Sequence, residues 1–392
     1  MTSSFVILNL AIGLSGLVLC LLGILQVLAG SRTDRATARY FLLSYSALFL
    51  FAGANLAGQL MKGKTEMKEI SVLSFEPLRI GQAENVPAGT GCTVFLCPEG
   101  MRAGIDVRGG GPASREITLL DPLMSAQEIH AVVLAGGSAF GLGAADGVMK
   151  YLEEQGVGYD VGVTRVPLVV QSDLFDLTVG DPFIRPDAAM GYAAAKQAME
   201  APNYRDGNRG AGCGATVGKI AGMATCMKTG IGSYALELEG LKVGAVVALN
   251  ALGDVFDWKT GKQIAGLLTE DRTAFRSSPQ AIQASIRAVK NRFVENTTLG
   301  VVFTNARFDK AALTKIAGMA HDGYGRSIRP VHTSIDGDSI YALSVGEVQA
   351  DLDLVGTLAA DTICKAICRA VENAESAYGY PAARDLPFAL DR

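Results

Sequence analysis

The segment 207–219, GNRGAGCGATVGK, combines closely spaced glycines with a lysine, as loops that bind nucleotide phosphates do. A Walker A loop needs a glycine five residues before its final glycine and a serine or threonine after the lysine. Those positions hold Cys213 and Ile220, so the pattern argues against nucleotide binding. Lys219 nevertheless opens an apolar stretch, where a buried charge is costly unless it has a function.

Two further groups of side chains could do chemistry. Asp336 and Asp338, in SIDGDS, are separated by one residue, so both carboxylates project to the same side of an extended chain. The Asp-Gly-Asp sequence of residues 336–338 is also typical of an exposed turn, which is the interpretation that the sequence alone favours. Thr297, in Asn296-Thr297-Thr298, fits an N-glycosylation pattern or the ordinary start of the β-like segment LGVVFT. The local sequence alone favours a structural role for Thr297.

Other motifs argue against cofactor and metal chemistry. Residues 136–141, GGSAFG, lack the glycine spacing of a dinucleotide fingerprint, and Phe140 replaces the last glycine of a serine-hydrolase elbow. The chain has three histidines without an HExxH motif, and its seven cysteines include no CxxC pair. We therefore expect no metal, no cofactor and no disulfide framework, and reduced thiols favour a cytoplasmic catalytic domain.

Composition limits the class of protein. The 392 residues are 49% hydrophobic and 19% charged, which excludes a disordered chain. A net charge of −4 without a long basic run argues against a nucleic-acid partner. The charge changes sign along the chain, since residues 1–66 carry five basic and two acidic side chains and residues 67–392 have an excess of seven acids. We therefore expect two parts, divided between residues 66 and 67.

The first part contains two uncharged runs, 5–30 and 40–61, each long enough for a helix that crosses a bilayer. They predict a hydrophobic helical hairpin in residues 1–66 and association with a membrane through residues 5–61. A cleaved signal peptide fits poorly, because no positive charge precedes the first run and the run is too long. A buried hairpin in a soluble protein is the alternative, and a misplaced start or a fusion stays open.

The second part mixes strands and helices without an internal repeat, which predicts an α/β fold. The expected strands cover residues 70–73, 93–96, 103–107, 130–135, 241–249, 299–304 and 340–343. The expected helices cover residues 142–155, 187–200, 279–291, 309–320 and 355–375.

Seven stretches in this part resemble, in order, the DmpA/NylC family of self-processing aminopeptidases and amide hydrolases. They are GCTVFLCPEG (91–100), IDVRGGGPASRE (105–116), VLAGGSAFGLGAADGVMKYLEE (133–154), GDPFIRPDAAMGYAA (180–194), GNRGAGCGATVGK (207–219), VGAVVALNALGDV (243–255) and NTTLGVVFTNA (296–306). The resemblance covers about residues 69–392.

The resemblance implies a four-layer αββα sandwich like that of N-terminal-nucleophile hydrolases, here preceded by the hydrophobic hairpin. Members of the family are made as one chain that cuts itself before an internal serine or threonine, which becomes the nucleophile. By its place before LGVVFTNA, Thr297 resembles this nucleophile. The cut between Asn296 and Thr297 would divide the catalytic domain into 67–296 and 297–392. The family also implies a homo-oligomer, a tetramer of processed αβ units.

The resemblance gives roles to a base and a lysine. A threonine hydroxyl is a weak nucleophile and needs a base, and the α-amine that cleavage frees has an ordinary pKa of about 7.7–8.0. The base is then the amine of Thr297 itself, and no histidine is required. Lys219 matches the family's lysine at the end of GATVGK, and its charge near the amine would keep that amine neutral.

Asn250, in LNALGDV, matches the family's oxyanion-site asparagine, whose amide donates to the tetrahedral intermediate. Asp336 and Asp338 resemble the aspartate pair of the nylon-hydrolase branch. Phe175 stands where some members have a tyrosine hydroxyl, so oxyanion stabilisation would depend more on Asn250 and on backbone amides.

The resemblance therefore implies a self-processing N-terminal-threonine amide hydrolase or peptidase. It would release amino-terminal residues or cleave small amide oligomers, and its partner would be a small amide or peptide substrate. The alternative is a catalytically inactive, membrane-tethered homologue that acts as a binding domain.

Overall fold

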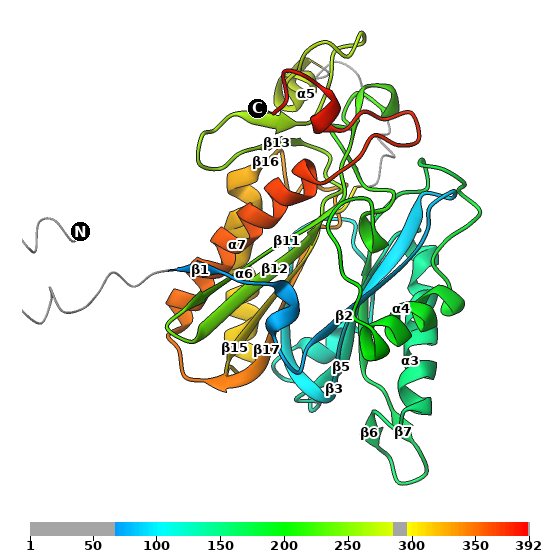
Figure 1. Cartoon of the computed structure of the whole chain (residues 1–392), viewed down its shortest axis with the longest axis vertical. Coiled ribbons are helices and arrows are strands. Elements are labelled where there is room, and N and C mark those ends of the chain that lie inside the picture. Colours follow the sequence, from blue (N-terminus) through cyan, green and yellow to red (C-terminus); the bar gives the residue numbers. More distant parts are fainter. Residues whose placement is uncertain (1–66, 285–295, 391–392) are drawn as a thin grey trace, which may run out of the picture. The chain divides into compact units, whose positions relative to one another are not determined.

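The computed structural model describes residues 67–284 and 296–390 (Figure 1). The hairpin expected in residues 1–66 lies outside the described residues. Within the described ranges, no helix is both long and apolar enough to span a bilayer.

Ten of the described strands form one sheet. Along it lie, in order, β1 (Lys68–Glu69), β11 (Ile231–Leu238), β12 (Leu241–Ala248), β15 (Leu299–Ala306), β17 (Ser339–Val348), β3 (Thr90–Val107), β5 (Ile129–Ala135), β8 (Val169–Asp173) and β4 (Ala113–Arg115). β2 (Arg79–Asn85) pairs with β3 beside this path. The pairs β15–β17 and β5–β8 are parallel, and the other pairs are antiparallel.

The long strand β3 folds this sheet into two layers. Its first half, up to Leu96, pairs with β5, and its second half, from Arg102, pairs with β17, with a register shift between Leu96 and Met101. Successive side chains of a strand point to opposite faces of the sheet, so alternate residues of one strand enter different cores. On β15, Val301 and Phe303 enter the core between the two sheet layers, whereas Val302 enters the core on the outer face.

Helices cover the two outer faces. α6 (Lys310–Ser327) and α7 (Leu352–Glu372) pack on the layer that contains β12, β15 and β17 (Figure 1). α3 (Ala144–Glu154) and α4 (Ala188–Glu200) pack on the layer that contains β5 and β8. The described part of the chain therefore has four layers, in the order helices, sheet, sheet, helices. One hydrophobic core lies between each pair of neighbouring layers.

Small elements complete the described part. They are α5 (Ser278–Ala284), β6 (Tyr159–Asp160), β7 (Arg165–Val166), β9 (Thr216–Val217), β10 (Met227–Lys228), β13 (Asp254–Phe256), β14 (Gln263–Ala265) and β16 (Ile328–Arg329). Short 3-10 turns cover Val72–Ser74, Ile117–Leu120, Ser138–Gly143, Gly210–Gly212, Met223–Thr225 and Ala383–Asp385.

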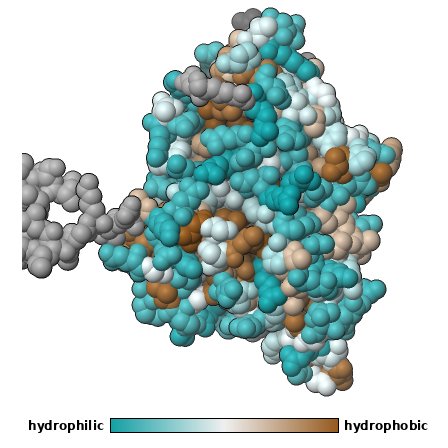
Figure 2. All heavy atoms as spheres, in the orientation of Figure 1, coloured by the Kyte–Doolittle hydropathy of each residue, from teal (hydrophilic) through white to brown (hydrophobic). Residues whose placement is uncertain are grey.

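The expected α/β fold is confirmed, and several of its elements differ from the expected ones. The strands expected at 93–96 and 103–107 are parts of the single strand β3, and the second half of the helix expected at 279–291 lies outside the described residues. The strand expected at 70–73 is wrong, because Ser71 caps the amide of Leu73 at 3.2 Å and starts a 3-10 turn. The turn buries Val72 and leaves Leu73 exposed. Figure 2 shows hydrophobic side chains gathered near the middle of the face that it presents. The helix expected at 309–320 continues to Ser327, because Tyr324 and its neighbours extend its buried face.

Candidate active site

Thr297 is positioned by the strand that follows it. In β15, Leu299 lies opposite Ala248 of β12 and opposite Ser339 of β17. Thr297, two positions before Leu299, must therefore lie beside the end of β12 and the start of β17. Its backbone amide donates to the carbonyl of Asn250 at 3.0 Å, and its side chain is only 3% exposed.

Lys219 follows β9 and is buried. Its Nζ donates to the side-chain oxygen of Asn250 at 2.8 Å and to the backbone oxygen of the same residue at 3.1 Å. Burial lowers the pKa of Lys219 to about 8, against smaller opposing effects of Cys226, Asp336 and other acidic groups. The ammonium therefore contacts the residue that holds the Thr297 amide.

Asn250 has its side-chain amide fixed from both ends. Its Oδ1 accepts from Lys219 and from the amide of Thr216 at 3.0 Å, and its Nδ2 donates to the carbonyl of Phe175 at 2.9 Å. Phe175 thus takes part through its backbone, although its ring has no donor. One of the two Nδ2 protons remains for a further acceptor.

The two aspartates are buried, each 1% exposed, so the exposed turn that SIDGDS suggested is wrong. Asp338 accepts from the amide of Thr298 at 2.8 Å and from the amide of His332 at 2.9 Å. Asp336 accepts from the amide and hydroxyl of Thr333. Burial, and then the neighbouring Asp336, raise the pKa of Asp338 to about 7. In the intact chain Asp338 therefore holds the residue after Thr297 rather than Thr297 itself.

The peptide bond between Asn296 and Thr297 is held by two donors. The hydroxyl of Thr297 donates to the carbonyl oxygen of Asn296, and the amide of Gly337 donates to the same oxygen at 2.8 Å. The structure thus brings all five residues expected in the site, and the expected junction, into one connected set of hydrogen bonds and neighbouring residues. Donors on a carbonyl oxygen stabilise the negative charge that develops there when its carbon is attacked.

Sequence reasoning missed a second buried lysine. Lys228 in β10 is fully buried, and its Nζ donates to the carbonyls of Gly212 (3.3 Å), Ala215 (3.1 Å) and Thr229 (2.5 Å). Burial lowers the pKa of Lys228 to about 7. Ala215 directly precedes Thr216, whose amide orients Asn250. A lysine among apolar residues, the signal noticed at Lys219, was also present here.

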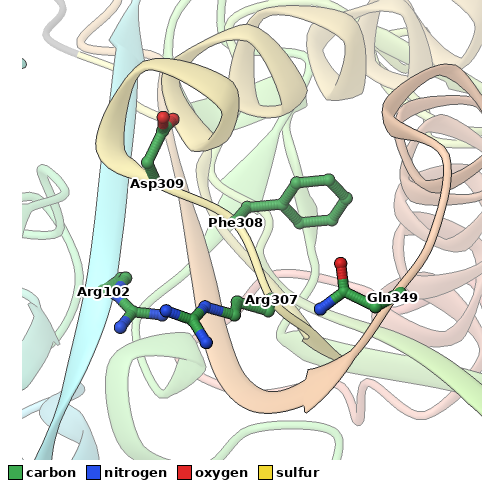
Figure 3. A pocket seen from close by; sticks show the side chains of 5 residues that line it. All are labelled: Arg102, Arg307, Phe308, Asp309 and Gln349. Atoms are coloured by element: carbon green, nitrogen blue, oxygen red, sulfur yellow. The ribbon is translucent and has the colours of Figure 1, made fainter.

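Within the described ranges, no group of three or more histidine, cysteine or acidic side chains is arranged to hold a metal ion. A cavity of about 480 Å³ lies at the other end of β15, between Arg102, Arg307, Phe308, Asp309 and Gln349 (Figure 3). β15 is eight residues long, so this cavity is roughly 30 Å from Thr297 and does not belong to the same site.

The chain is similar to known proteins in sequence and in fold. The family model of peptidase family S58 matches residues 72–383. A protein of Mycobacterium leprae (strain TN), named as an uncharacterized aminopeptidase, is 38% identical over 82% of this chain and 93% of the relative. A 6-aminohexanoate-oligomer endohydrolase of Agromyces sp. (strain KY5R) is 30% identical over 76% of this chain and 82% of that relative.

Among solved structures, the L-aminopeptidase D-Ala-esterase/amidase of Ochrobactrum anthropi is similar, with a TM-score of 0.59. Its title describes a variant of the Ntn (N-terminal nucleophile) hydrolase fold. The two chains are 17% identical, and the match covers 82% of this chain and 91% of the other, so the likeness concerns the fold alone.

The lowered pKa of Lys219 predicts a pH-dependent stability. Between about pH 8 and pH 10.5 the unfolded lysine is protonated and the folded one is neutral, so the unfolded state binds more protons. The free energy of unfolding should therefore rise with pH through this window. Lys219→Met should flatten the rise, as measured by denaturant unfolding at pH 8 and pH 10 in an uncleaved Thr297→Ala background.

Lys259→Met is the control for this prediction, because it removes a lysine from an exposed position and leaves the buried Lys219 in place. Its slope with pH should equal that of the Thr297→Ala parent. An equal slope in Lys219→Met would contradict a lowered pKa for Lys219.

Proposed function

Because the chain belongs to peptidase family S58, we propose that it cuts itself before Thr297 and then uses this threonine as the nucleophile of an amide hydrolase. Its relatives confirm the resemblance to the DmpA/NylC family, and they make the chain an enzyme that hydrolyses peptide or amide bonds. The order of helix and sheet layers supports the four-layer αββα sandwich of that family.

The hydrogen bonds on the Asn296 carbonyl are the observation that carries this proposal. The hydroxyl oxygen of Thr297 attacks the carbonyl carbon of Asn296, and the developing negative charge lies on the oxygen that Gly337 already contacts. The C–N bond then breaks, the Thr297 nitrogen keeps the proton from the hydroxyl, and an ester joins Asn296 to Thr297. Water hydrolyses this ester, leaving a carboxylate on Asn296 and a free amine on Thr297.

The free amine supplies the base for turnover. It takes the proton of the Thr297 hydroxyl as that oxygen attacks a substrate amide, and it returns the proton to the leaving amine. Lys219 and the Thr297 nitrogen both donate to the backbone oxygen of Asn250, so the lysine lies close to the amine. Its positive charge favours the neutral form of that amine. The second proton of Asn250 Nδ2 is the side-chain donor for the oxyanion, which is the role that the family resemblance implies for this residue.

Buried charges disfavour the alternative of an inactive binding domain. Lys219, Lys228, Asp336 and Asp338 are each at most 1% exposed, and such groups are costly to bury. A domain that only binds a partner through its surface has no use for these buried groups, which lower its stability. The test of self-cleavage below separates the two functions.

The relatives support a proposal for the substrate, and the sequence supports one for the setting of the enzyme. We propose a peptide or small amide as substrate, since the relatives include aminopeptidases and oligomer endohydrolases. We also propose a homo-oligomer of processed units, with the catalytic domain in the cytoplasm and membrane association through residues 5–61.

Self-cleavage gives the first test of this function. The purified full chain should give a fragment of 96 residues that begins with Thr297, as read by N-terminal sequencing. Thr297→Ala should remain one chain without hydrolytic activity, because no hydroxyl is left to attack. Thr297→Ser should be cleaved and keep part of the activity. A fragment with another first residue, or an active Thr297→Ala enzyme, would exclude Thr297 as the nucleophile.

Lys228 should act on the reaction through Asn250. Lys228→Met removes the donors that hold the loop before Thr216, so Asn250 should lose its orientation. A misplaced donor can cost up to about 100-fold in rate, and we expect kcat to fall by about 10- to 100-fold with a smaller change in KM. Steady-state kinetics on an aminoacyl p-nitroanilide would measure the split between kcat and KM.

Lys310→Met provides a matched control. Lys310 is 4% exposed, and its Nζ likewise donates to three backbone carbonyls, those of Leu119, Met124 and Ala126. This variant should lose stability, measured by thermal unfolding, but retain kcat. If both variants lose kcat in proportion to their lost stability, Lys228 has no positioning role.

Residues 1–66 should be dispensable for catalysis, because every residue proposed for the site lies after Met67. A chain that starts at Met67 should cut itself before Thr297 and hydrolyse the same substrates as the full chain. The full chain should fractionate with membranes and resist carbonate extraction. A shortened chain that neither folds nor cleaves would show that residues 1–66 are part of the catalytic domain.

A further inference from the structure

The residue before the cut is held like one residue of a β-strand. The amide of Asn296 donates to the carbonyl of Ile335 at 3.3 Å, and its carbonyl accepts from the amide of Gly337 at 2.8 Å. Both bonds flank Asp336, with which Asn296 forms a parallel β-bridge. A single residue thus uses both of its backbone groups against residues 335–337, as peptides do when they add to an exposed strand.

The chemistry of self-cleavage links this strand pairing to turnover. In the ester that the cut produces, the acyl group of Asn296 is bonded to the hydroxyl oxygen of Thr297. In turnover the acyl group of the substrate is bonded to the same oxygen. The two intermediates differ only in the acyl group, so the backbone that holds one is available to hold the other.

We propose that the carbonyl of Ile335 and the amide of Gly337 form the binding site for the acyl residue of the substrate, and that they select L-α-aminoacyl groups. This inference rests on the proposed function. Gly337 becomes a backbone donor to the substrate carbonyl, and Ile335 accepts from the substrate's α-nitrogen. Asn296 fills this site before the cut.

The edge formed by 335–337 is both close to the nucleophile and well supported. A Cβ added to Gly337 would lie 2.5 Å from the hydroxyl oxygen of Thr297, so only glycine allows this approach. From behind, the amide of Gly110 donates to the carbonyl of Thr333 at 3.1 Å, and the amide of Gly111 donates to the carbonyl of Asp336 at 2.8 Å. The glycine run 109–111 thus holds this edge in place.

The spacing of the two bonds selects among substrates. In an α-aminoacyl group one carbon separates the nitrogen from the carbonyl, as in Asn296. A 6-aminohexanoyl group places five carbons there, so it cannot reach Ile335 and Gly337 in the same way. A D-aminoacyl group has the two backbone groups but points its side chain differently. Asn296 is fully buried, so the site also limits the size of the side chain.

Two parallel series test the inference. The first is the rate of self-cleavage of full-length chains made by cell-free translation, with asparagine or Asn296→Ala, Asn296→Ser and Asn296→Leu at the junction. The second is kcat/KM of the wild-type enzyme on the p-nitroanilides of L-Asn, L-Ala, L-Ser and L-Leu. The p-nitroanilides of D-Asn and 6-aminohexanoate are the matched control substrates.

The two series should rank the four residues in the same order. Both control substrates should have a lower kcat/KM than L-Asn p-nitroanilide. The 6-aminohexanoyl group keeps its carbonyl but loses the bond to Ile335, and one lost hydrogen bond lowers kcat/KM about fivefold. The D-aminoacyl group keeps both backbone groups, but its side chain does not enter the space that the Asn296 side chain fills. Unrelated orders, or a 6-aminohexanoyl substrate cleaved as well as L-Asn p-nitroanilide, would overturn the inference while leaving the proposed function intact. No cleavage and no hydrolysis in either series would instead contradict the function itself. The substrate series uses only the wild-type enzyme. If an Asn296 variant folds poorly, the comparison of L-Asn p-nitroanilide with the two control substrates still tests the inference.

Discussion

The pairing of β15 between β12 and β17 is the constraint on which the site depends. Val301 and Phe303 enter one core and Val302 enters the other, so a slip by one residue would exchange the side chains of both cores. With that register fixed, the end of β12, the start of β15 and the start of β17 must meet. The geometry around the bond between Asn296 and Thr297 is therefore a consequence of hydrophobic packing further along the same strands.

The site concentrates charge where packing alone would exclude it. Burial lowers the pKa of Lys219 and Lys228 and raises that of Asp338. Each of these groups forms hydrogen bonds with backbone or amide partners, which offset part of the cost of removing it from water. An arrangement of this kind reduces stability at the place where reactivity is needed, as is common in enzymes.

The sequence predicted the fold class and most of the long elements, because alternating and helical apolar patterns report directly on burial. It also brought Lys219 to notice, since a charge in an apolar stretch needs a reason. Thr297 could be singled out only by resemblance, because a threonine before a strand has no distinctive type or spacing. Gly337 and Ile335 could not be found at all, since their contribution comes from backbone groups that every residue has.

The position of the proposed cut has a consequence for how the enzyme can be assembled. The piece from Thr297 onward supplies β15, α6, β16, β17 and α7, and β15 and β17 lie between β12 and β3 of the other piece. Breaking the junction would leave every one of these strand pairs in place, so the halves would stay interlocked. Covalent continuity would then matter only while the chain folds, and an enzyme once taken apart would have to rebuild the middle of its sheet between two separate molecules.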